Sequence, residues 1–392
     1  MKRYTFLFIL IIALLAHSCS STFRTINLAD NKKPVNGLIY SLPATKLNIK
    51  IEITEVRKQK GPFYEFLHLY FDTEEGIKED ELIYQITDVS IESSPIADPD
   101  FYFSVIPGKR TSVGMLNITP EGFLAGINLT DYLADRIHTE QIILSEKISE
   151  SSLNYADFSL NSILETKYDT LYKDVLIDSV IVKVPVITKK DVIKSKEKRA
   201  KEIADILFLL RDDRNALLKG ENDGNNFPDG DALKIMVSEL NTLEKQYMSL
   251  FTGRISRVPK TYTYEIIPEK DSTYFHIIHF SEKSGITDQE NGIPLTLKLI
   301  IEKPSTILNS YSMNSIQTDY EKTKQYPGLV YRIPVKTNCE IYLQNELLYK
   351  KPILISQEGP LNMIPCKMIN ENISVEFYPE TGSLKRISKI KE

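Results

Sequence analysis

The residue with the most specific chemistry is Cys19, which follows an apolar segment near the amino terminus. Two basic residues precede an uncharged run at positions 4–16, which is typical of a signal peptide. A membrane-spanning helix needs about 20 residues, so this run is too short to be one. The pentapeptide LAHSC at 15–19 resembles a bacterial lipobox, in which the cysteine thiol is acylated before cleavage. We therefore predict a signal peptide at 1–18 and lipid attachment at Cys19.

Ordinary signal-peptidase cleavage is the alternative, because Ala16 and Ser18 are small at the two positions that this enzyme reads. Two observations favour the lipid. An ordinary cut would leave a reactive thiol at the mature amino terminus, and the Ser-Ser-Thr at 20–22 resembles a flexible lipoprotein tether. The lipid would make the protein an anchored one, whereas ordinary cleavage would release it.

Cys339 and Cys366 are the only other cysteines. Disulfides form in oxidising compartments, so the two thiols are a candidate disulfide of the carboxy-terminal part of the chain. The alternative is that each is a small buried apolar residue on a separate strand. Both interpretations are compatible with the sequence.

Catalytic and metal-binding motifs are absent: the chain has no HEXXH, GxSxG, P-loop or GxGxxG sequence. His276 and His279 lie three apart, which in a regular strand places them on opposite faces and argues against a zinc pair. The Asp-rich loop at 221–230 lacks the ligand spacing of an EF-hand. The acidic run at 72–81 is more typical of a solvated loop than of a glycosidase carboxylate pair. We predict no catalytic residue, metal or cofactor.

Composition places the chain among globular β proteins. Of 392 residues, 42% are hydrophobic and 9% aromatic, which is unlike a disordered chain. The mature part has a net charge of −7 and no basic stripe, which argues against nucleic acid as a partner. The 21 tyrosines often alternate with Val, Ile and Thr, and this pattern favours strands.

Two segments are exceptions to the β pattern. Apolar residues recur at three- and four-residue steps through 189–219 and again through 231–252, and each segment is followed by a glycine, Gly220 or Gly253. A glycine at this position commonly ends a helix. The pattern predicts an antiparallel helical hairpin.

The chain also contains an internal repeat. GLIYSLP at 37–43 aligns with GLVYRIP at 328–334, and LNITPEGFLAGI at 116–127 aligns with VEFYPETGSLKRI at 375–387. Proline and glycine between apolar runs indicate hairpin turns in the second pair. Two matched segments in the same order indicate either a duplicated β unit or convergent strand edges.

We therefore predict an α+β, mainly β fold, with two antiparallel, sandwich-like β domains that bracket the helical hairpin. The chain is predicted to begin with a signal peptide (1–18) and a tether (19–34). An amino-terminal β domain (35–186), the helical hairpin (187–253) and a carboxy-terminal β domain (254–392) follow.

The motifs also resemble one family. The lipobox-like start, GLIYSLPATKL, AKEIADILFLLRDDRNALLKGE, LEKQYMSLFTG, GLVYRIPVK and FYPETGSLKRI are similar to an uncharacterised domain-of-unknown-function family, 4831, of Bacteroidota envelope lipoproteins. The resemblance implies an envelope location and implies no activity. Three Asp-Ser/Thr sequences also resemble O-glycosylation acceptors of that phylum, at Thr170, Ser179 and Ser272.

Three functions fit these observations. The preferred one is a non-enzymatic lipoprotein that binds or assembles with a partner protein or glycan at the outer membrane. The alternatives are a glycan-directed hydrolase with an unidentified carboxylate pair and a purely structural accessory. No acidic residue directly follows the cysteine, so the expected location is the periplasmic face.

Overall fold

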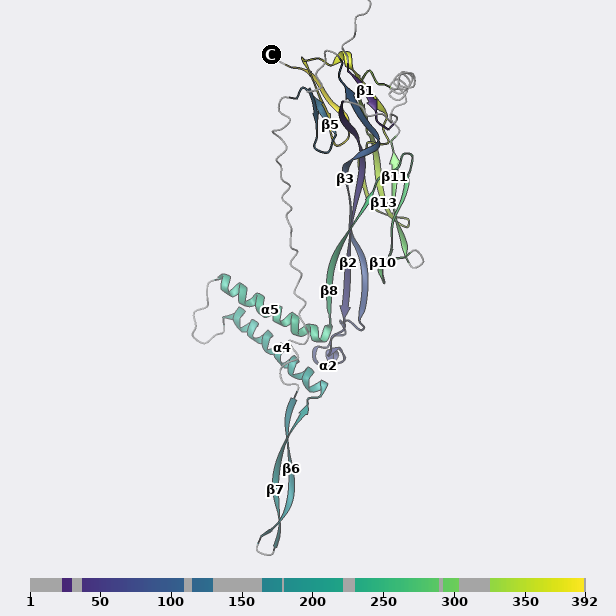
Figure 1. Cartoon of the computed structure of the whole chain (residues 1–392). Helices are drawn as coiled ribbons and strands as arrows, with labels where there is room; N and C mark the ends of the chain where they lie inside the picture. Colours follow the sequence, from purple (N-terminus) through teal and green to yellow (C-terminus); the bar gives the residue numbers. More distant parts are fainter. Residues whose placement is uncertain are drawn as a thin grey trace, which may run out of the picture.

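The computed structural model describes residues 23–29, 37–108, 115–129, 164–177, 180–220, 230–288, 292–302 and 325–390. This part of the chain is mainly β, with several antiparallel sheets and few helices, which confirms the predicted class. Figure 1 shows an elongated molecule. A long β body leads to two helices, α4 (Lys196–Lys219) and α5 (Gly230–Thr252), and then to the projecting strands β6 (Leu164–Ile177) and β7 (Val180–Ile193).

The first sheet forms the length of the body. Its strands, in spatial order, are β1 (Arg24–Asn27), β3 (Glu81–Ile106), β2 (Leu38–Gln59) and β8 (Arg254–Ile266). Apolar residues alternate with polar ones along β2, and Leu47, Ile49, Ile51 and Ile53 are all buried while the residues between them are partly exposed. One face of the sheet is therefore apolar over most of its length.

A second sheet packs on that apolar face. Its strands are β10 (Gly285–Thr287), β9 (Tyr274–Ser281), β11 (Ile293–Ile301), β13 (Val335–Leu343) and β14 (Glu346–Ile355). Leu295, Leu297 and Ile341 of this sheet share one buried cluster with Ile49 and Ile91 of the first sheet. Burial of each such side chain is worth about 1.5–3 kcal/mol, so this cluster is a main source of the stability of the body.

Two further sheets close the end of the body that lies away from the helices (Figure 1). One pairs β12 (Gly328–Arg332) with β15 (Leu361–Pro365), and the other has the order β17 (Ser383–Lys389), β16 (Ile373–Tyr378), β5 (Leu124–Ile127), β4 (Leu116–Ile118). Tyr40 lies at their centre. Its hydroxyl donates to the carbonyl of Val330 (2.9 Å) and accepts from the Val330 N–H (3.2 Å), and burial raises its pKa far above the ordinary value.

The sequence repeat has a structural counterpart. The N–H of Ser41 donates to the carbonyl of Gly122 (2.9 Å), and the N–H of the aligned Arg332 donates to the carbonyl of the aligned Gly382 (3.2 Å). Both turn glycines have positive φ, +91° and +72°, where a side chain would be strained. The same long-range backbone bond is thus made in each copy of the repeat, which favours the duplicated unit over a chance likeness of turns.

The sheets do not follow the predicted division of the chain into two β domains. β8, from the carboxy-terminal side of the helices, pairs with β2, and β16 pairs with β5. Strands from both sides of the helical insertion therefore complete the same sheets, because each needs a partner for its backbone groups.

The helices pack on a short segment at the end of β2. The α4 helix begins after Ser195, whose hydroxyl accepts a hydrogen bond from the N–H of Lys198 (3.2 Å), and it ends at Gly220, with φ +71°. Gly253 follows α5 with φ +86°; both glycines end helices as predicted. A buried cluster joins α4 and α5 to α2 (Leu67–Phe71) through Leu207, Phe251 and Leu67. Among the described residues, no helix is long and apolar enough to cross a membrane.

Candidate functional site

One cluster of charged side chains lies at the junction between the β body and the helices. A pocket of about 550 Å³ is lined there mainly by charged side chains of the segments around 60–65 and 78–80 and by Lys196. Two of the carboxylates have partners: Glu65 pairs with Lys196 (2.8 Å), and Asp80 accepts from the backbone N–H of Lys60 (2.7 Å). Part of the acidic run at 72–81 is thus used in surface pairs, and no isolated pair of catalytic carboxylates is assembled among these residues.

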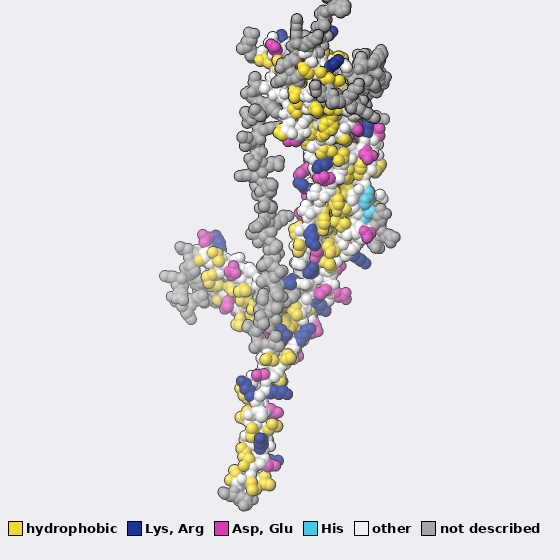
Figure 2. Space-filling view, in the orientation of Figure 1, with side chains coloured by type: hydrophobic (Ala, Val, Ile, Leu, Met, Phe, Trp, Pro, Cys, Tyr) yellow, Lys and Arg dark blue, Asp and Glu magenta, His cyan; other side chains and the backbone are white. Residues whose placement is uncertain are grey.

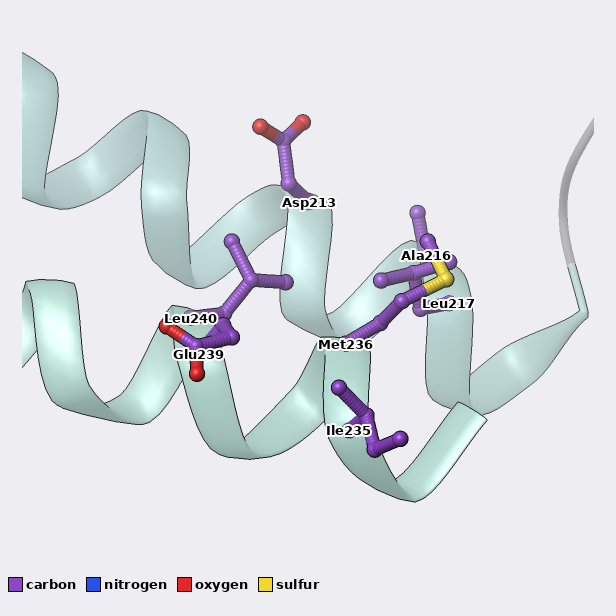
Figure 3. A pocket seen from close by; sticks show the side chains of 7 residues that line it. All are labelled: Asp213, Ala216, Leu217, Ile235, Met236, Glu239 and Leu240. Atoms are coloured by element: carbon purple, nitrogen blue, oxygen red, sulfur yellow. The ribbon is translucent and has the colours of Figure 1, made fainter. Parts of the chain in front are cut away.

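A second hollow, of about 460 Å³, lies between α4 and α5. Figure 3 shows Leu217, Met236 and Leu240 between the two helices, with Asp213 and Glu239 near the rim. It is an open apolar groove with one carboxylate from each helix at its edge, and among the described residues no histidine, cysteine, serine or lysine lines it.

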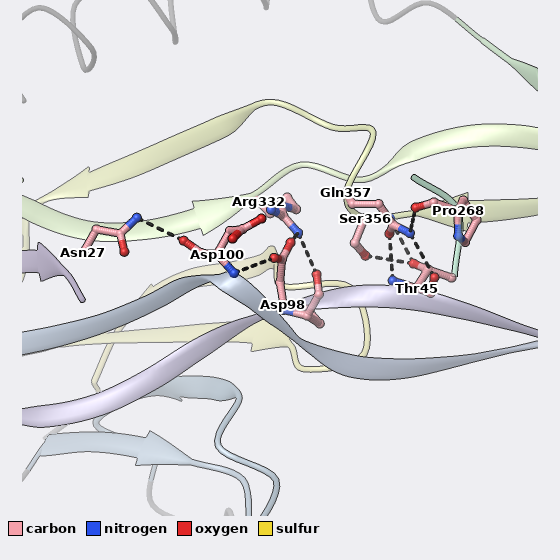
Figure 4. A network of polar contacts seen from close by, with 9 residues as sticks. Asn27, Thr45, Asp98, Asp100, Pro268, Arg332, Ser356 and Gln357 are labelled. Atoms are coloured by element: carbon pink, nitrogen blue, oxygen red, sulfur yellow. Dashed lines mark hydrogen bonds and ion pairs between the residues drawn. The ribbon is translucent and has the colours of Figure 1, made fainter. Parts of the chain in front are cut away.

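Among the described residues, Arg332 has the most buried charged side chain, and its contacts are with the protein interior. Its Nη1 contacts Asp98 Oδ2 (2.9 Å) (Figure 4) and the carbonyl of Pro43 (3.0 Å). Its guanidinium carbon lies 4.6 Å from the centre of the Phe101 ring. Burial lowers the pKa of Arg332, and the charge of Asp98 opposes that shift. The ion pair joins the two repeats inside the body, where a substrate has no access because Arg332 is 2% exposed.

A second polar connection lies beside it. Thr45 and Gln357 exchange two hydrogen bonds, N–H to Oε1 (2.7 Å) and Nε2 to the carbonyl (3.0 Å), and the N–H of Ser356 donates to the Thr45 hydroxyl (2.9 Å) (Figure 4). These bonds fix β2 against the end of β14.

The histidine pair differs from the prediction. His276 and His279 do not lie on opposite faces, since their ring centres are 4.2 Å apart. The pairing of β9 with β11 shifts register between Leu295 and Thr296, and this bulge adds one residue to β9 between the histidines. A bulge reverses the alternation of side chains, so residues three apart share a face. Burial, and then repulsion by His279, lower the pKa of His276.

Two histidines alone are a weak metal site, and no cluster of three or more ligating side chains occurs in the described part of the chain.

The β6–β7 ribbon exposes apolar side chains on both of its strands. The two strands pair along their whole length, and every side chain of β6 from Thr166 to Ile177 is exposed. Figure 2 shows apolar side chains along the projecting ribbon. They include large exposed residues on both strands: Leu171, Tyr172, Leu176, Ile177, Val180, Ile181 and Ile187. Exposed apolar surface of this kind marks interaction sites.

The sequence patterns alone do not distinguish this ribbon from other strands. Its signal is the alternation of Leu, Tyr and Val on either side of Asp178-Ser179, together with Pro185 in the returning strand. The same residue types also form core strands. Only the exposure of these side chains in the structure therefore distinguishes the ribbon.

The predicted modification residues are spread over the molecule. Cys19 and Ser179 lie outside the described residues. Thr170 is exposed on β6, and Ser272 is half-buried in a turn where its N–H donates to the carbonyl of Glu269 (3.1 Å). The two described positions, Thr170 and Ser272, lie on different elements.

The candidate disulfide is not formed in the structure, which corrects that prediction. Cys339 and Cys366 are both free and buried. They belong to different apolar clusters, Cys339 between the two large sheets and Cys366 at the closed end. Burial raises the pKa of the Cys339 thiol to about 12. Both therefore act as small apolar residues, the alternative that the sequence left open.

Comparison with known proteins gives one match. Residues 36–167 and 186–385 match the family described as Domain of unknown function (DUF4831). No curated protein and no solved structure matches the chain. Because the family match covers most of the sequence and includes the repeat and both helices, the chain belongs to this family.

Proposed function

We propose that the protein is a non-enzymatic envelope lipoprotein that serves as a binding or assembly module, and that the β6–β7 ribbon is its binding surface. One observation carries the proposal: the ribbon projects from the helical end with most of its side chains exposed, whereas the buried charge of Arg332 is held in an ion pair inside the body.

In finer detail, we infer a sandwich-like β body of two repeats, with the antiparallel helical hairpin inserted between them. This body serves as a spacer. The shared apolar cluster between its two large sheets supports a rigid connection between the ribbon and the amino-terminal end.

The position of the amino terminus supports the anchor. Phe23 is buried in the cluster at the closed end of the body, and Cys19 precedes it by four residues. Four residues span at most about 14 Å. A lipid on Cys19 would therefore hold the molecule at the end opposite the ribbon, and we place it at the periplasmic face of the outer membrane.

The anchor is tested by replacing Cys19 with Ala and separating membranes from soluble protein. We expect the wild type in the membrane fraction, labelled by a fatty-acid analogue, and the variant unlabelled and soluble. Persistent membrane partition without label would instead indicate that a partner retains the protein.

The binding surface is tested separately, by replacing residues 168–185 with a short turn. We expect the wild type to retain envelope components that the shortened chain does not. Equal recovery with both chains would remove the ribbon from the proposal. Intact-mass analysis of the same material would show whether Thr170, Ser179 or Ser272 carries a glycan.

A further inference from the structure

The β6–β7 ribbon lacks the partners that stabilise other sheets. A two-stranded ribbon alone is marginally stable in water, and three or more strands are normally needed. An ion pair between Glu165 and Lys198 fixes its base, but the side chains of β6 beyond Glu165 are exposed to the tip. The ribbon is therefore suited to accept another strand.

The edge of β6 is open, whereas the other long edges are blocked. Proline lacks an N–H and is a common protection of edge strands. Every other edge strand of ten or more residues in the described chain contains proline: β7 has Pro185, β8 has Pro259 and β14 has Pro352. β3 is covered by β1 only at Phe103–Ile106, and its uncovered part contains Pro95 and Pro99. The 14 residues of β6 contain none.

Pro185 also shows which groups of β6 face outward. It lies opposite Tyr172 inside the ladder, where its nitrogen cannot donate to β6 and must face away. Tyr172 is then in a non-hydrogen-bonded pair, so its own N–H and C=O point to the open edge. Backbone groups alternate along a strand, so Tyr168, Thr170 and Asp174 present theirs to the same edge.

We propose that the open edge of β6 pairs with β6 of a second copy of this chain, antiparallel and centred on Leu171. In this register Thr170 faces Tyr172 of the second copy, which matches their outward backbone groups. Asp169 faces Lys173 of the second copy, and the two-fold symmetry repeats this pair on the other side of Leu171.

Charge selects this register over its neighbours. Asp169 and Lys173 form no ion pair in the part of the chain that is described, so both are available. A register centred on Thr170 would place Lys167 opposite Lys173 of the second copy, which are like charges. A register centred on Tyr172 would place no positive side chain opposite a negative one. Opposite charges directly across a strand pair are stabilising and like charges are destabilising.

The resulting four-stranded sheet has β7 at each outer edge, where Pro185 prevents further growth. The contact is thus a closed two-fold dimer. The two bodies extend in opposite directions, with their amino-terminal ends far apart, and both lipids reach one membrane when the long axis lies along its surface.

The family match is consistent with a surface particular to this chain. It omits residues 168–185, and the described residues among them, 168–177 and 180–185, belong to the ribbon and include most of the pairing segment. The inference deepens the proposed assembly function, and it needs neither the lipid nor another protein.

The test is the mass of the mature chain from Ser20 onward, measured by light scattering over a wide range of concentration. We expect the wild type to form dimers. Asp169→Lys and Lys173→Asp each place like charges opposite one another twice, so each variant alone should dimerise at least about tenfold more weakly.

Mixing the two variants provides the decisive comparison. When a chain with Asp169→Lys pairs with a chain carrying Lys173→Asp, each positive side chain at 169 or 173 faces a negative one on the other chain. The equimolar mixture should therefore recover the dimer. Lys167→Asp is the matched control, because Lys167 faces Val175 in this register and the dimer should persist.

A wild type that is monomeric at every concentration would overturn the proposal. Dimers that persist in both single variants, or a mixture that stays monomeric, would also overturn it. The Cys19 fractionation is unaffected by these results, so a failure here is distinguishable from a failure of the anchor.

Discussion

Removal of Arg332 should be among the most damaging single changes in the body. Arg332→Met deletes the guanidinium that contacts Asp98 at 2.9 Å and leaves a largely buried carboxylate, whose side chain is 10% exposed. Its remaining contact is a hydrogen bond from the N–H of Asp100 (3.1 Å). Breaking one side of a buried ion pair costs about 3–5 kcal/mol, since the other charge is left without compensation. We expect a loss of this size in the free energy of unfolding, measured by urea denaturation.

Two further variants separate the charge from the packing. Arg332→Met combined with Asp98→Leu removes both charges, and replacement of a buried pair by apolar groups is often neutral, so the double variant should recover much of the loss. Lys50→Met is the exposed control. It breaks the ion pair between Lys50 and Glu92, whose side chains are 44% and 60% exposed, respectively. The free energy of unfolding should fall by less than about 1 kcal/mol.

The reasoning would be refuted by an Arg332→Met variant that loses no more stability than Lys50→Met. A double variant as unstable as the single one would show that shape, rather than the unpaired charge, dominates. The Nε of Arg332 has no hydrogen-bond partner among the described residues, so the native ion pair leaves one buried donor unsatisfied. Removing both charges also removes this unsatisfied donor, which supports the expected recovery of stability.

Three other predictions follow from the same structure. Thiol titration of the mature chain should find Cys339 and Cys366 unreactive when native and both free after denaturation without reductant. The pKa of His276 is below 6.5 in the folded state, so as pH falls the unfolded chain binds a proton before the folded one does. The free energy of unfolding should therefore decrease as pH drops below about 6.5. His279→Gln should raise the pKa of His276, measured by an NMR titration. A Cβ on Gly328 would lie 2.2 Å from the carbonyl oxygen of Ile364, so Gly328→Ala should destabilise the closed end, measured by thermal unfolding.

Each of these has a contrary result. Fewer than two thiols after denaturation would show that a covalent bond forms. A His276 pKa unchanged in the His279→Gln variant would assign its shift to burial alone, which is the larger cause. For the glycine, Gly230→Ala is the control, because no atom lies within 4 Å of its added Cβ; equal stability of the two variants would contradict the close approach.

Local patterns in the sequence accounted for the elements themselves. Alternation of Leu47, Ile49 and Ile51 with polar residues defines one buried face of β2 because side chains in a strand point alternately to its two sides. Gly220 and Gly253 end helices for an equally local reason, since each residue has a left-handed conformation that glycine adopts without strain. The repeat was also visible, because Gly122 and Gly382 of its second segment are required by turns.

Contacts between distant segments were decided only in three dimensions. The bulge that brings His276 beside His279 depends on how β9 pairs with β11, and nothing in the sequence around the histidines marks it. The burial of Arg332 with Asp98 joins residues 234 positions apart. The two cysteines are separated because Cys339 lies in β13, whereas Cys366 lies in a short 3-10 turn after β15, which belongs to a different sheet. In each case a few backbone pairings set the environment of a side chain, and pairing between distant strands is not encoded in any one segment.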